Sequence, residues 1–225
     1  DTHLQIEGPV VAEFQKLFMD TWNKQKGPRL AEKNYFPKLD KRGDEIVRAI
    51  GSTSDDPGSP IYLTLLSAIE HAEKQVHITN AYFAPDPQLL KALIDAALRG
   101  VEVKLILPSQ TDSWAVFHAG RSHYSKLLRG GVKIYERRGA VMHSKTASID
   151  GVWSTIGSTN LDFRSHLHND EVIAVVLGQG FGAQMQAMFE ADIAASRPVT
   201  LPVWRQRPLA MRLKEMVARV WKYWL

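Results

Sequence analysis

Four side chains in one short stretch of the chain could together bind and transfer a phosphate group: His143, Lys145, Ser158 and Asn160. An imidazole can attack phosphorus or move a proton near neutral pH. An ammonium group supplies positive charge, and hydroxyl and amide groups can donate hydrogen bonds to the non-bridging oxygens during a displacement. This combination predicts a phosphate site that requires no metal ion.

The turn between these residues predicts how they come together. Asp150-Gly151 stands between two β-rich runs and is typical of a two-residue hairpin, because both central residues must accept a positive φ. In such a hairpin Ile149 faces Val152, and counting outward places Ser158 directly across from His143. We therefore expect the histidine and the serine to be neighbours on adjacent strands.

Parity along the strands assigns the remaining residues. Side chains two apart on a strand share a face, so Lys145 and Asn160 are expected on the same side as His143. Asp150 has the opposite parity and lies in the turn, which indicates a structural, hydrogen-bonding role. Glu171, on the next expected strand, could accept a proton from the far nitrogen of the histidine, as the carboxylate does in a Ser-His-Asp triad.

The complete pattern, H-x-K-x4-D-x6-G-S-x-N beginning at His143, resembles the signature of the phospholipase D superfamily. An isolated His-x-Lys pair would fit the polar face of any amphipathic hairpin, but the whole pattern is rarely met by chance. The catalytic residues that the resemblance implies are His143, Lys145, Asp150 and Glu171, and the phosphate-binding residues are Lys145, Ser158 and Asn160. It implies no cofactor and no metal.

Four further segments resemble bacterial cardiolipin synthases, and in particular the second catalytic half of those enzymes. They are Asn80-Ala-Tyr-Phe-Ala-Pro-Asp86, Arg99-Gly-Val-Glu-Val103, Leu107-Pro-Ser-Gln-Thr-Asp112 and Gly157-Ser-Thr-Asn-Leu-Asp-Phe-Arg-Ser165. The opening residues, Asp1 to Val10, resemble the end of the first half, just past its own signature. Members of the family build one site from two signatures, in one chain or across a homodimer, so the resemblance implies that a second half is needed.

The resemblance implies phosphatidyl transfer between two phosphatidylglycerol molecules, which gives cardiolipin and glycerol through a phosphohistidine intermediate. One alternative is a phospholipase D that hydrolyses phospholipids to phosphatidic acid, because the motif specifies phosphodiester chemistry and leaves the acceptor open. A second alternative is a non-catalytic, membrane-binding half. A nuclease of the same superfamily is disfavoured, because the sequence has no obvious basic and aromatic track for nucleic acid.

For other residues the sequence indicates a function less clearly. Tyr82 lies at an expected strand end, where its ring could contact the substrate or pack in the core. Arg164 directly follows the phosphate-binding turn and could contact a phosphate or a structural carboxylate. His166-Leu-His168 resembles a pair of metal ligands on alternate strand positions, but a structural role is expected there.

Composition sets broad limits on the partners. The 225 residues carry a net charge of +4, which favours anionic partners such as phospholipid headgroups. With no cysteine there is no disulfide and no thiolate nucleophile. No apolar run is long enough to cross a bilayer, so we expect a protein peripheral to, or anchored at, the bacterial cytoplasmic membrane by other segments.

Hydrophobic periodicity predicts an α/β fold, a mixed β-sheet flanked by helices. The expected strands span residues 2–6, 46–50, 76–79, 101–107, 132–135, 141–149, 152–157 and 171–177. The expected helices span residues 10–22, 59–74, 86–98, 113–128 and 181–194. By the resemblance, this is the fold of one of the two halves that make a complete phospholipase D-like enzyme.

Four segments are expected along the chain. Residues 1–26 are the tail of a preceding half, 27–44 a linker rich in Gly, Pro and charge, and 45–196 the catalytic domain with its single signature. Residues 197–225 form a C-terminal segment with an amphipathic helix over 209–225. Such a helix packs on its own domain in most proteins, but its cationic flanks and its Trp and Tyr residues also suit an anionic bilayer.

Overall fold

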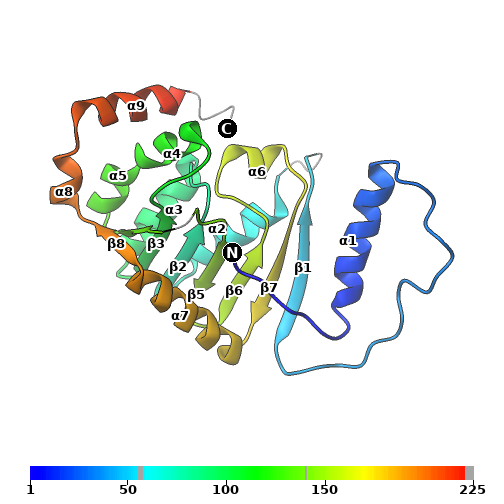
Figure 1. Ribbon diagram of the computed structural model, residues 1–225. Coiled ribbons are helices and arrows are strands. Elements are labelled where there is room, and N and C mark those ends of the chain that lie inside the picture. The colour runs from blue at the N-terminus through cyan, green and yellow to red at the C-terminus, as the bar shows by residue number, and fades with distance from the viewer. Residues whose placement is uncertain (55–57, 140, 221–225) are drawn as a thin grey trace.

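The computed structural model describes residues 1–54, 58–139 and 141–220 (Figure 1). Within these residues the fold is α/β, with a mixed sheet of eight strands flanked by helices, as the sequence predicts. The strand order is β1-β7-β6-β5-β2-β3-β4-β8. The neighbours β2, β3 and β4 are parallel, and every other neighbouring pair in this order is antiparallel.

The strands and helices alternate along most of the chain. The strands are β1 (Ile46–Ser52), β2 (Gln75–Asn80), β3 (Glu102–Pro108), β4 (Lys133–Arg137), β5 (Lys145–Ile149), β6 (Trp153–Gly157), β7 (Glu171–Leu177) and β8 (Ser196–Val199). The helices are α1 (Val11–Lys24), α2 (Pro60–Glu70), α3 (Pro87–Leu98), α4 (Trp114–Arg121), α5 (Tyr124–Arg129), α6 (Phe163–Leu167), α7 (Gln179–Ala194), α8 (Leu201–Arg205) and α9 (Leu209–Val220).

The main core lies between the sheet and the helices α2, α3 and α5, whereas α7 crosses the opposite face (Figure 1). Local sequence explains where α3 begins, because Asp86 accepts a hydrogen bond from the backbone of Leu89 at 2.7 Å and Pro87 follows at the first helical position. The hydroxyl of Tyr62 on α2 donates to the same Asp86 carboxylate at 2.7 Å. This bond ties the two covering helices together.

The N-terminal part lies at the edge of the sheet. Helix α1 stands beside β1, has no buried residue, and is followed by a long loop to β1 (Figure 1). The expected strand at residues 2–6 does not form, because this segment pairs with no sheet edge and β1 takes the place beside β7. Instead, residues 2–6 line two pockets against β6, β7 and α7.

Other differences from the expected elements have local causes. The predicted helix 113–128 is broken into α4 and α5, where the hydroxyl of Ser122 bonds the carbonyl of Ala119 at 2.6 Å. The predicted strand 141–149 begins only at Lys145. The elements that the sequence pattern did not predict are α6, α8 and β8, all of five residues or fewer. Such short segments carry too little periodicity to be recognised.

The hairpin β5–β6 forms, but its predicted register is wrong by one residue. Asp150 and Gly151 have the expected positive φ values, 54° and 70°. However, Ile149 pairs with Trp153, because Val152 belongs to the turn and its N–H bonds the carbonyl of Ile149 at 3.2 Å. The loop therefore has three residues, and Thr146, not Lys145, lies across from Ile156.

The C-terminal helix forms over Leu209–Val220. The rest of the predicted helix, residues 221–225 with Trp224, lies outside the described residues. Before it, β8 pairs with β4, so the sheet continues past residue 196. None of the helices in the described ranges is both long and apolar enough to cross a membrane.

Candidate active site

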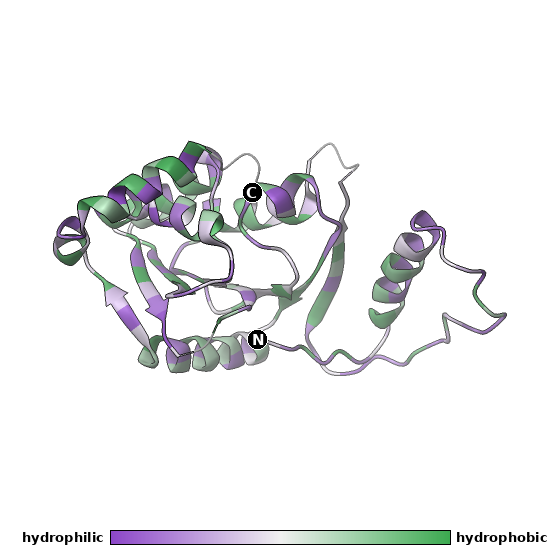
Figure 2. Cartoon of the chain, turned by 45° about the horizontal axis from the view of Figure 1, so that its top comes forward, coloured by the Kyte–Doolittle hydropathy of each residue, from purple (hydrophilic) through white to green (hydrophobic). Residues whose placement is uncertain are grey.

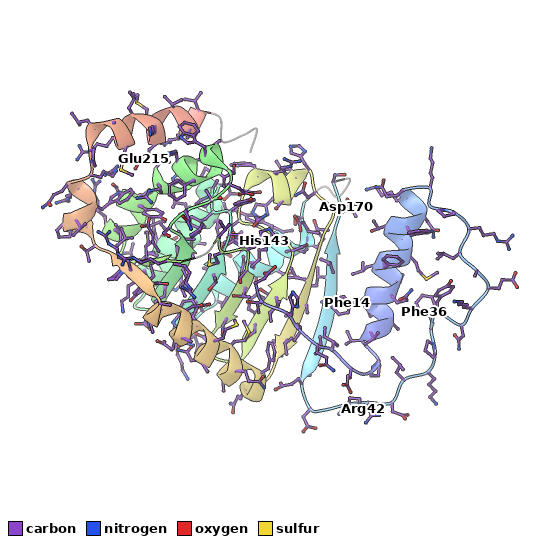
Figure 3. The ribbon with its side chains drawn as sticks, viewed as in Figure 1. Phe14, Phe36, Arg42, His143, Asp170 and Glu215 are labelled. Atoms are coloured by element: carbon purple, nitrogen blue, oxygen red, sulfur yellow. The ribbon has the colours of Figure 1, made fainter. Side chains whose placement is uncertain are left out.

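A pocket of about 680 Å³ brings together three of the four predicted side chains, His143, Lys145 and Ser158. Its polar end also contains Asp1, and its walls are apolar side chains of β6, β7, α1 and the N-terminal segment. Figure 3 shows His143 near the ends of β5 and β6 that face α6. The sequence thus predicts this grouping correctly although the register behind it is wrong.

His143 precedes β5 and is well exposed, with 60% of its side chain accessible. Burial of part of the ring and the nearby Lys145 ammonium hold the pKa of His143 below its usual 6.5. The lowered pKa favours the neutral imidazole, whose lone pair can attack phosphorus or abstract a proton. The edge of the ring is also close to Tyr82, with ring centroids 6.4 Å apart.

The carboxylate beside His143 comes from Asp1 and not from Glu171. The Oδ2 atom of Asp1 lies 3.6 Å from Nδ1 of the imidazole. The neighbouring Thr2 holds the segment in place, since its hydroxyl bonds that of Ser144 at 3.2 Å. This contact orients the ring and leaves Nε2 free for a substrate.

Glu171 interacts with the turn that carries Ser158. Its carboxylate accepts a short hydrogen bond from the hydroxyl of Ser158 and a 3.2 Å bond from the amide of Asn169. Ser158 is held further by its backbone N–H, which donates to the carbonyl of Val172 at 3.0 Å. Between the described atoms of Glu171 and His143 there is no hydrogen bond, so the predicted contact is absent in this chain alone.

Lys145 begins β5 and is almost fully buried. Burial lowers the pKa of Lys145, while the carboxylates of Glu171 and Asp162 oppose the change. Its ammonium donates to the carbonyl of His143 at 2.6 Å, which fixes the group beside the histidine. A desolvated cation in this position interacts strongly with a phosphate because little water screens it.

Gly157 explains why the turn after β6 approaches β7 so closely. A Cβ atom at this position would lie 2.3 Å from the carbonyl oxygen of Val172, so only glycine fits. The buried Asn80 at the end of β2 supports the same turn, because its Oδ1 accepts from the backbone of Leu161 at 3.1 Å. The geometry of the Ser158 turn is thus set by residues on β7 and β2.

Asn160 does not line the pocket. Its backbone N–H donates to the hydroxyl of Ser165 at 3.2 Å, and its side-chain Oδ1 is buried with no partner among the described residues. Arg164 is exposed on α6, one turn further on. The structure therefore brings neither of these side chains to the histidine.

Tyr82 lies beside His143, and its hydroxyl donates to the carboxylate of Asp112. This bond is the main reason that the pKa of Tyr82 rises to about 12, so the phenol stays protonated. Tyr82 also packs against a small apolar cluster formed by Ala84, Val116, Ala119 and Ala218. It is thus partly a core residue and partly a neighbour of His143.

Asp150 is at the opposite end of β5 from the histidine. Its carboxylate accepts three backbone hydrogen bonds, from Glu73 at 3.0 Å, Lys74 at 2.8 Å and Gln75 at 2.9 Å. Although burial alone would raise the pKa of Asp150, these backbone donors lower it. The residue ties the hairpin turn to the start of β2.

Two acidic residues near the site were missed by the sequence reasoning. Asp162 is 4% exposed, and burial raises its pKa to about 6, while its Oδ1 caps α6 by accepting from Ser165 N at 2.8 Å. The cap pattern Asp162-x-x-Ser165 could have revealed it. Asp1 could have been found from a repeated spacing. Asp1 stands seven residues before Gly8, and Glu171 stands seven residues before Gly178; a helix follows each glycine.

The His166-Leu-His168 pair is not assembled into a metal centre. His166 lies against Tyr62, with ring centroids 4.4 Å apart, and burial lowers the pKa of His166 to about 4. No group of three or more His, Asp or Glu side chains in the described parts of the chain is placed to hold a metal ion.

Comparison with known sequences gives a consistent result. Residues 65–193 match the family described as "Cardiolipin synthase, PLD-like domain". The chain is 34% identical to cardiolipin synthase A of Pectobacterium carotovorum over 219 residues, which are 96% of this chain and 45% of that protein. It is also 34% identical over 222 residues to cardiolipin synthase of Alkalihalophilus pseudofirmus, covering 98% of this chain and 44% of that protein. The chain thus spans about half the length of these relatives.

Solved structures share the fold. Nuc of Salmonella typhimurium, a phospholipase D family member, superposes with a TM-score of 0.58 at 22% identity, over 70% of this chain and 99% of that chain. Phosphatidylserine synthase of Haemophilus influenzae gives a TM-score of 0.65 at 13% identity, over 83% of this chain and 49% of that chain. The fold therefore corresponds to a complete single-domain protein in the first case and to half of a larger chain in the second.

Proposed function

The chain belongs to the cardiolipin synthase family with a phospholipase D-like domain, and from this we propose that it forms one half of a phosphatidyltransferase active site. The proposed reaction joins two phosphatidylglycerol molecules into cardiolipin and releases glycerol. The observation that supports it best is the pocket that His143, Lys145 and Ser158 share. There an imidazole of lowered pKa lies beside the Asp1 carboxylate, together with a buried ammonium and a hydrogen-bonded hydroxyl.

The first step transfers the phosphatidyl group to a histidine of the second half. A nitrogen–phosphorus bond forms, and the bond from phosphorus to the headgroup glycerol oxygen breaks. Protonated His143 gives its proton to that oxygen, so glycerol leaves as a neutral alcohol. The lowered pKa of His143 makes the ring a stronger acid once it is protonated. The Asp1 carboxylate, 3.6 Å from Nδ1, is placed to pair with that protonated ring.

The second step uses the same groups in reverse. Neutral His143 takes the proton from the primary hydroxyl of a second phosphatidylglycerol, whose oxygen attacks phosphorus while the nitrogen–phosphorus bond breaks. Cardiolipin is released, and His143 is again protonated. In both steps Lys145 and Ser158 are proposed to hold the non-bridging oxygens, and Tyr82 to contact the rest of the substrate. Asn160 and Arg164 do not line the pocket, so they are given no such contact.

The domain limits form part of the proposal. Residues 1–26 would end a preceding half, 27–44 would link it to the catalytic domain 45–196, and 197–225 would carry the amphipathic helix. The position of α1 at the edge of the sheet and the length of the chain relative to its relatives both support this division. The second half could belong to the same chain or to a homodimer mate.

The repeated spacing extends the proposal to Glu171. If Asp1 ends the preceding half, then each half contributes one carboxylate at the same place, seven residues before a glycine. Because Asp1 lies beside the histidine of this half, Glu171 is proposed to lie beside the histidine of the other half. The hydrogen bond from the Ser158 hydroxyl to the Glu171 carboxylate would then link the phosphate-binding residues of this half to the histidine of the other half.

Two alternative functions, a phospholipase D and a non-catalytic half, are distinguished by the experiment described below. A phospholipase D would transfer the phosphatidyl group to water and give phosphatidic acid. A non-catalytic half would bind membranes without turnover. We expect the protein at the bacterial cytoplasmic membrane in each case, because the substrates or partners are membrane lipids, and we expect no nucleic acid partner.

The test is to mix the chain with phosphatidylglycerol vesicles, with and without the upstream half, and to follow glycerol and cardiolipin by mass spectrometry. The His143→Ala variant should give no cardiolipin, whereas His71→Ala, at an exposed histidine after α2, should match the wild type. Phosphatidic acid without cardiolipin would establish the hydrolase instead. No turnover in any mixture would contradict the catalytic proposal.

A further inference from the structure

Helix α9 exposes its apolar side. Its hydrophobic residues recur at helical spacing and lie largely in solvent: Leu209, Leu213, Met216, Val217 and Val220, with exposures of 78%, 57%, 61%, 44% and 75%. We call these five residues the outer stripe. Figure 2 colours α9, at the rim of the molecule, with both strongly hydrophobic and strongly hydrophilic residues. An uncovered apolar stripe of this kind requires a binding partner.

The opposite side of α9 holds the helix on the domain. Glu215 and Ala218 are buried, and at 3.6 residues per turn they lie roughly opposite the outer stripe. The guanidinium of Arg207 makes paired hydrogen bonds to the Glu215 carboxylate, at 2.8 Å for the shortest, and lies over the ring of Trp204. Figure 3 shows Glu215 on the inner side of α9. This buried ion pair prevents the helix from rolling to cover its stripe, because rolling would leave the charges unpaired.

The charges beside the stripe are positive. Arg212, Lys214 and Arg219 are exposed, and none of them pairs with a carboxylate in the described part of the chain. The only acidic residue in α9 is Glu215, which is already paired. Cationic residues on both sides of an apolar stripe fit a surface that has negative headgroups and an apolar interior.

We propose that the outer stripe of α9 docks on an anionic phospholipid bilayer, with the helix lying in the plane of the headgroups. The proposal deepens the proposed function, on which it rests for the choice of lipid. A second copy of the chain is a poorer occupant, because pairing two stripes would bring two sets of cations together. Five side chains are also few beside the roughly 20 to 30 residues that each partner of a stable protein interface contributes.

Contacts connect the docked helix to the active site. Ala218 on the inner side of α9 packs in one cluster with Ala84, Val116 and Ala119, and Tyr82 packs against this cluster. The Tyr82 ring is in turn the neighbour of His143. A bilayer held by α9 would therefore be linked to His143 through Ala218, this cluster and Tyr82.

The test measures binding of the chain to sedimenting vesicles of phosphatidylcholine with and without phosphatidylglycerol. Wild type should bind the vesicles with phosphatidylglycerol, and salt should weaken the binding. Leu213→Glu with Val217→Glu should reduce the partition coefficient by roughly tenfold or more. Leu98→Glu, at a leucine that is 72% exposed on α3, should bind as wild type does.

Several outcomes would overturn the proposal. They are equal binding of the double variant and wild type, no preference for phosphatidylglycerol, or a dimer in light scattering that the double variant abolishes. Circular dichroism melting of all variants separates loss of docking from loss of folding. His143→Ala should bind vesicles normally, so a failure of the proposed catalysis and a failure of docking give different results.

Discussion

The Asp1 carboxylate lies 3.6 Å from Nδ1 of His143, although the two residues are far apart in the sequence. At this separation the contact is longer than a hydrogen bond, and it becomes an ion pair when the ring is protonated. Catalytic hydrogen bonds in ligand-free sites are often long and tighten when the substrate binds. A carboxylate at Nδ1 also directs Nε2 toward the pocket, which is the geometry that a proton-transferring histidine needs.

We therefore predict that Asp1→Asn lowers the turnover of the chain paired with its second half by about 10- to 100-fold, with a smaller effect on KM. The asparagine keeps the shape but cannot stabilise the protonated ring. Glu7→Gln, at an exposed acid in the same segment, is the matched control and should keep full activity. Full activity of Asp1→Asn would contradict a role for this carboxylate at His143.

A second prediction concerns the pKa of His143, which burial and the Lys145 ammonium hold below 6.5. Replacing Lys145 by Gln removes a positive charge that disfavours the imidazolium, so the pKa of His143 should rise. Titration of the His143 ring protons by NMR measures this directly. Lys91→Gln, on the exposed face of α3, should leave the titration unchanged. An unchanged pKa in the Lys145 variant would mean that the two groups do not interact.

The sequence predicts much of this site because its chemistry depends on residue types and on which elements are adjacent. The α/β alternation, the hairpin turn at Asp150-Gly151 and the pocket shared by His143, Lys145 and Ser158 all follow from local patterns. The register is wrong because a turn of two residues and one of three have the same Asp-Gly signature, and only the Val152 hydrogen bond distinguishes them.

Long-range contacts are what the sequence does not reveal. Nothing in the local pattern around Glu171 indicates that its carboxylate bonds Ser158 and not His143. Likewise, the periodicity of α9 locates an apolar stripe, but the pattern alone leaves open whether the stripe faces the domain or a bilayer. The buried pair of Arg207 and Glu215 sets this orientation, and that pair depends on the three-dimensional path of the chain.

A third prediction separates structure from catalysis at Asp150. Asp150→Ala leaves three backbone N–H groups without their acceptor and should reduce the free energy of unfolding by about 2 to 4 kcal/mol. Because the pKa of this carboxyl is lowered in the folded state, its contribution is present above the unfolded-state pKa and is lost as the pH falls through the folded value. Urea unfolding measures the loss, with Asp44→Ala, in the loop before β1, as the control.

The same variant tests the catalytic assignment that the signature implies. Asp150 lies at the far end of β5 from His143, so turnover per folded molecule should stay within about twofold of wild type. A large loss of turnover in variant protein that is still folded would contradict the structural role.

The last prediction concerns Asp162, whose burial raises its pKa to about 6. The folded state then binds more protons than the unfolded state between pH 4 and 6, so this group makes the protein less stable as the pH rises through that window. The difference between the folded value and the ordinary 3.8 corresponds to about 3 kcal/mol. Asp162→Asn cannot ionise but can still accept the cap bond from Ser165.

The variant should therefore gain stability relative to wild type as the pH rises from about 4 to about 7, by up to about 3 kcal/mol. Urea unfolding of both proteins at several pH values measures this difference, and taking the difference cancels the other groups that titrate in the range. Asp20→Asn, at an exposed acid on α1, should show no such trend. A constant difference between Asp162→Asn and wild type would mean that Asp162 is ionised throughout, stabilised by Lys145 in spite of its burial.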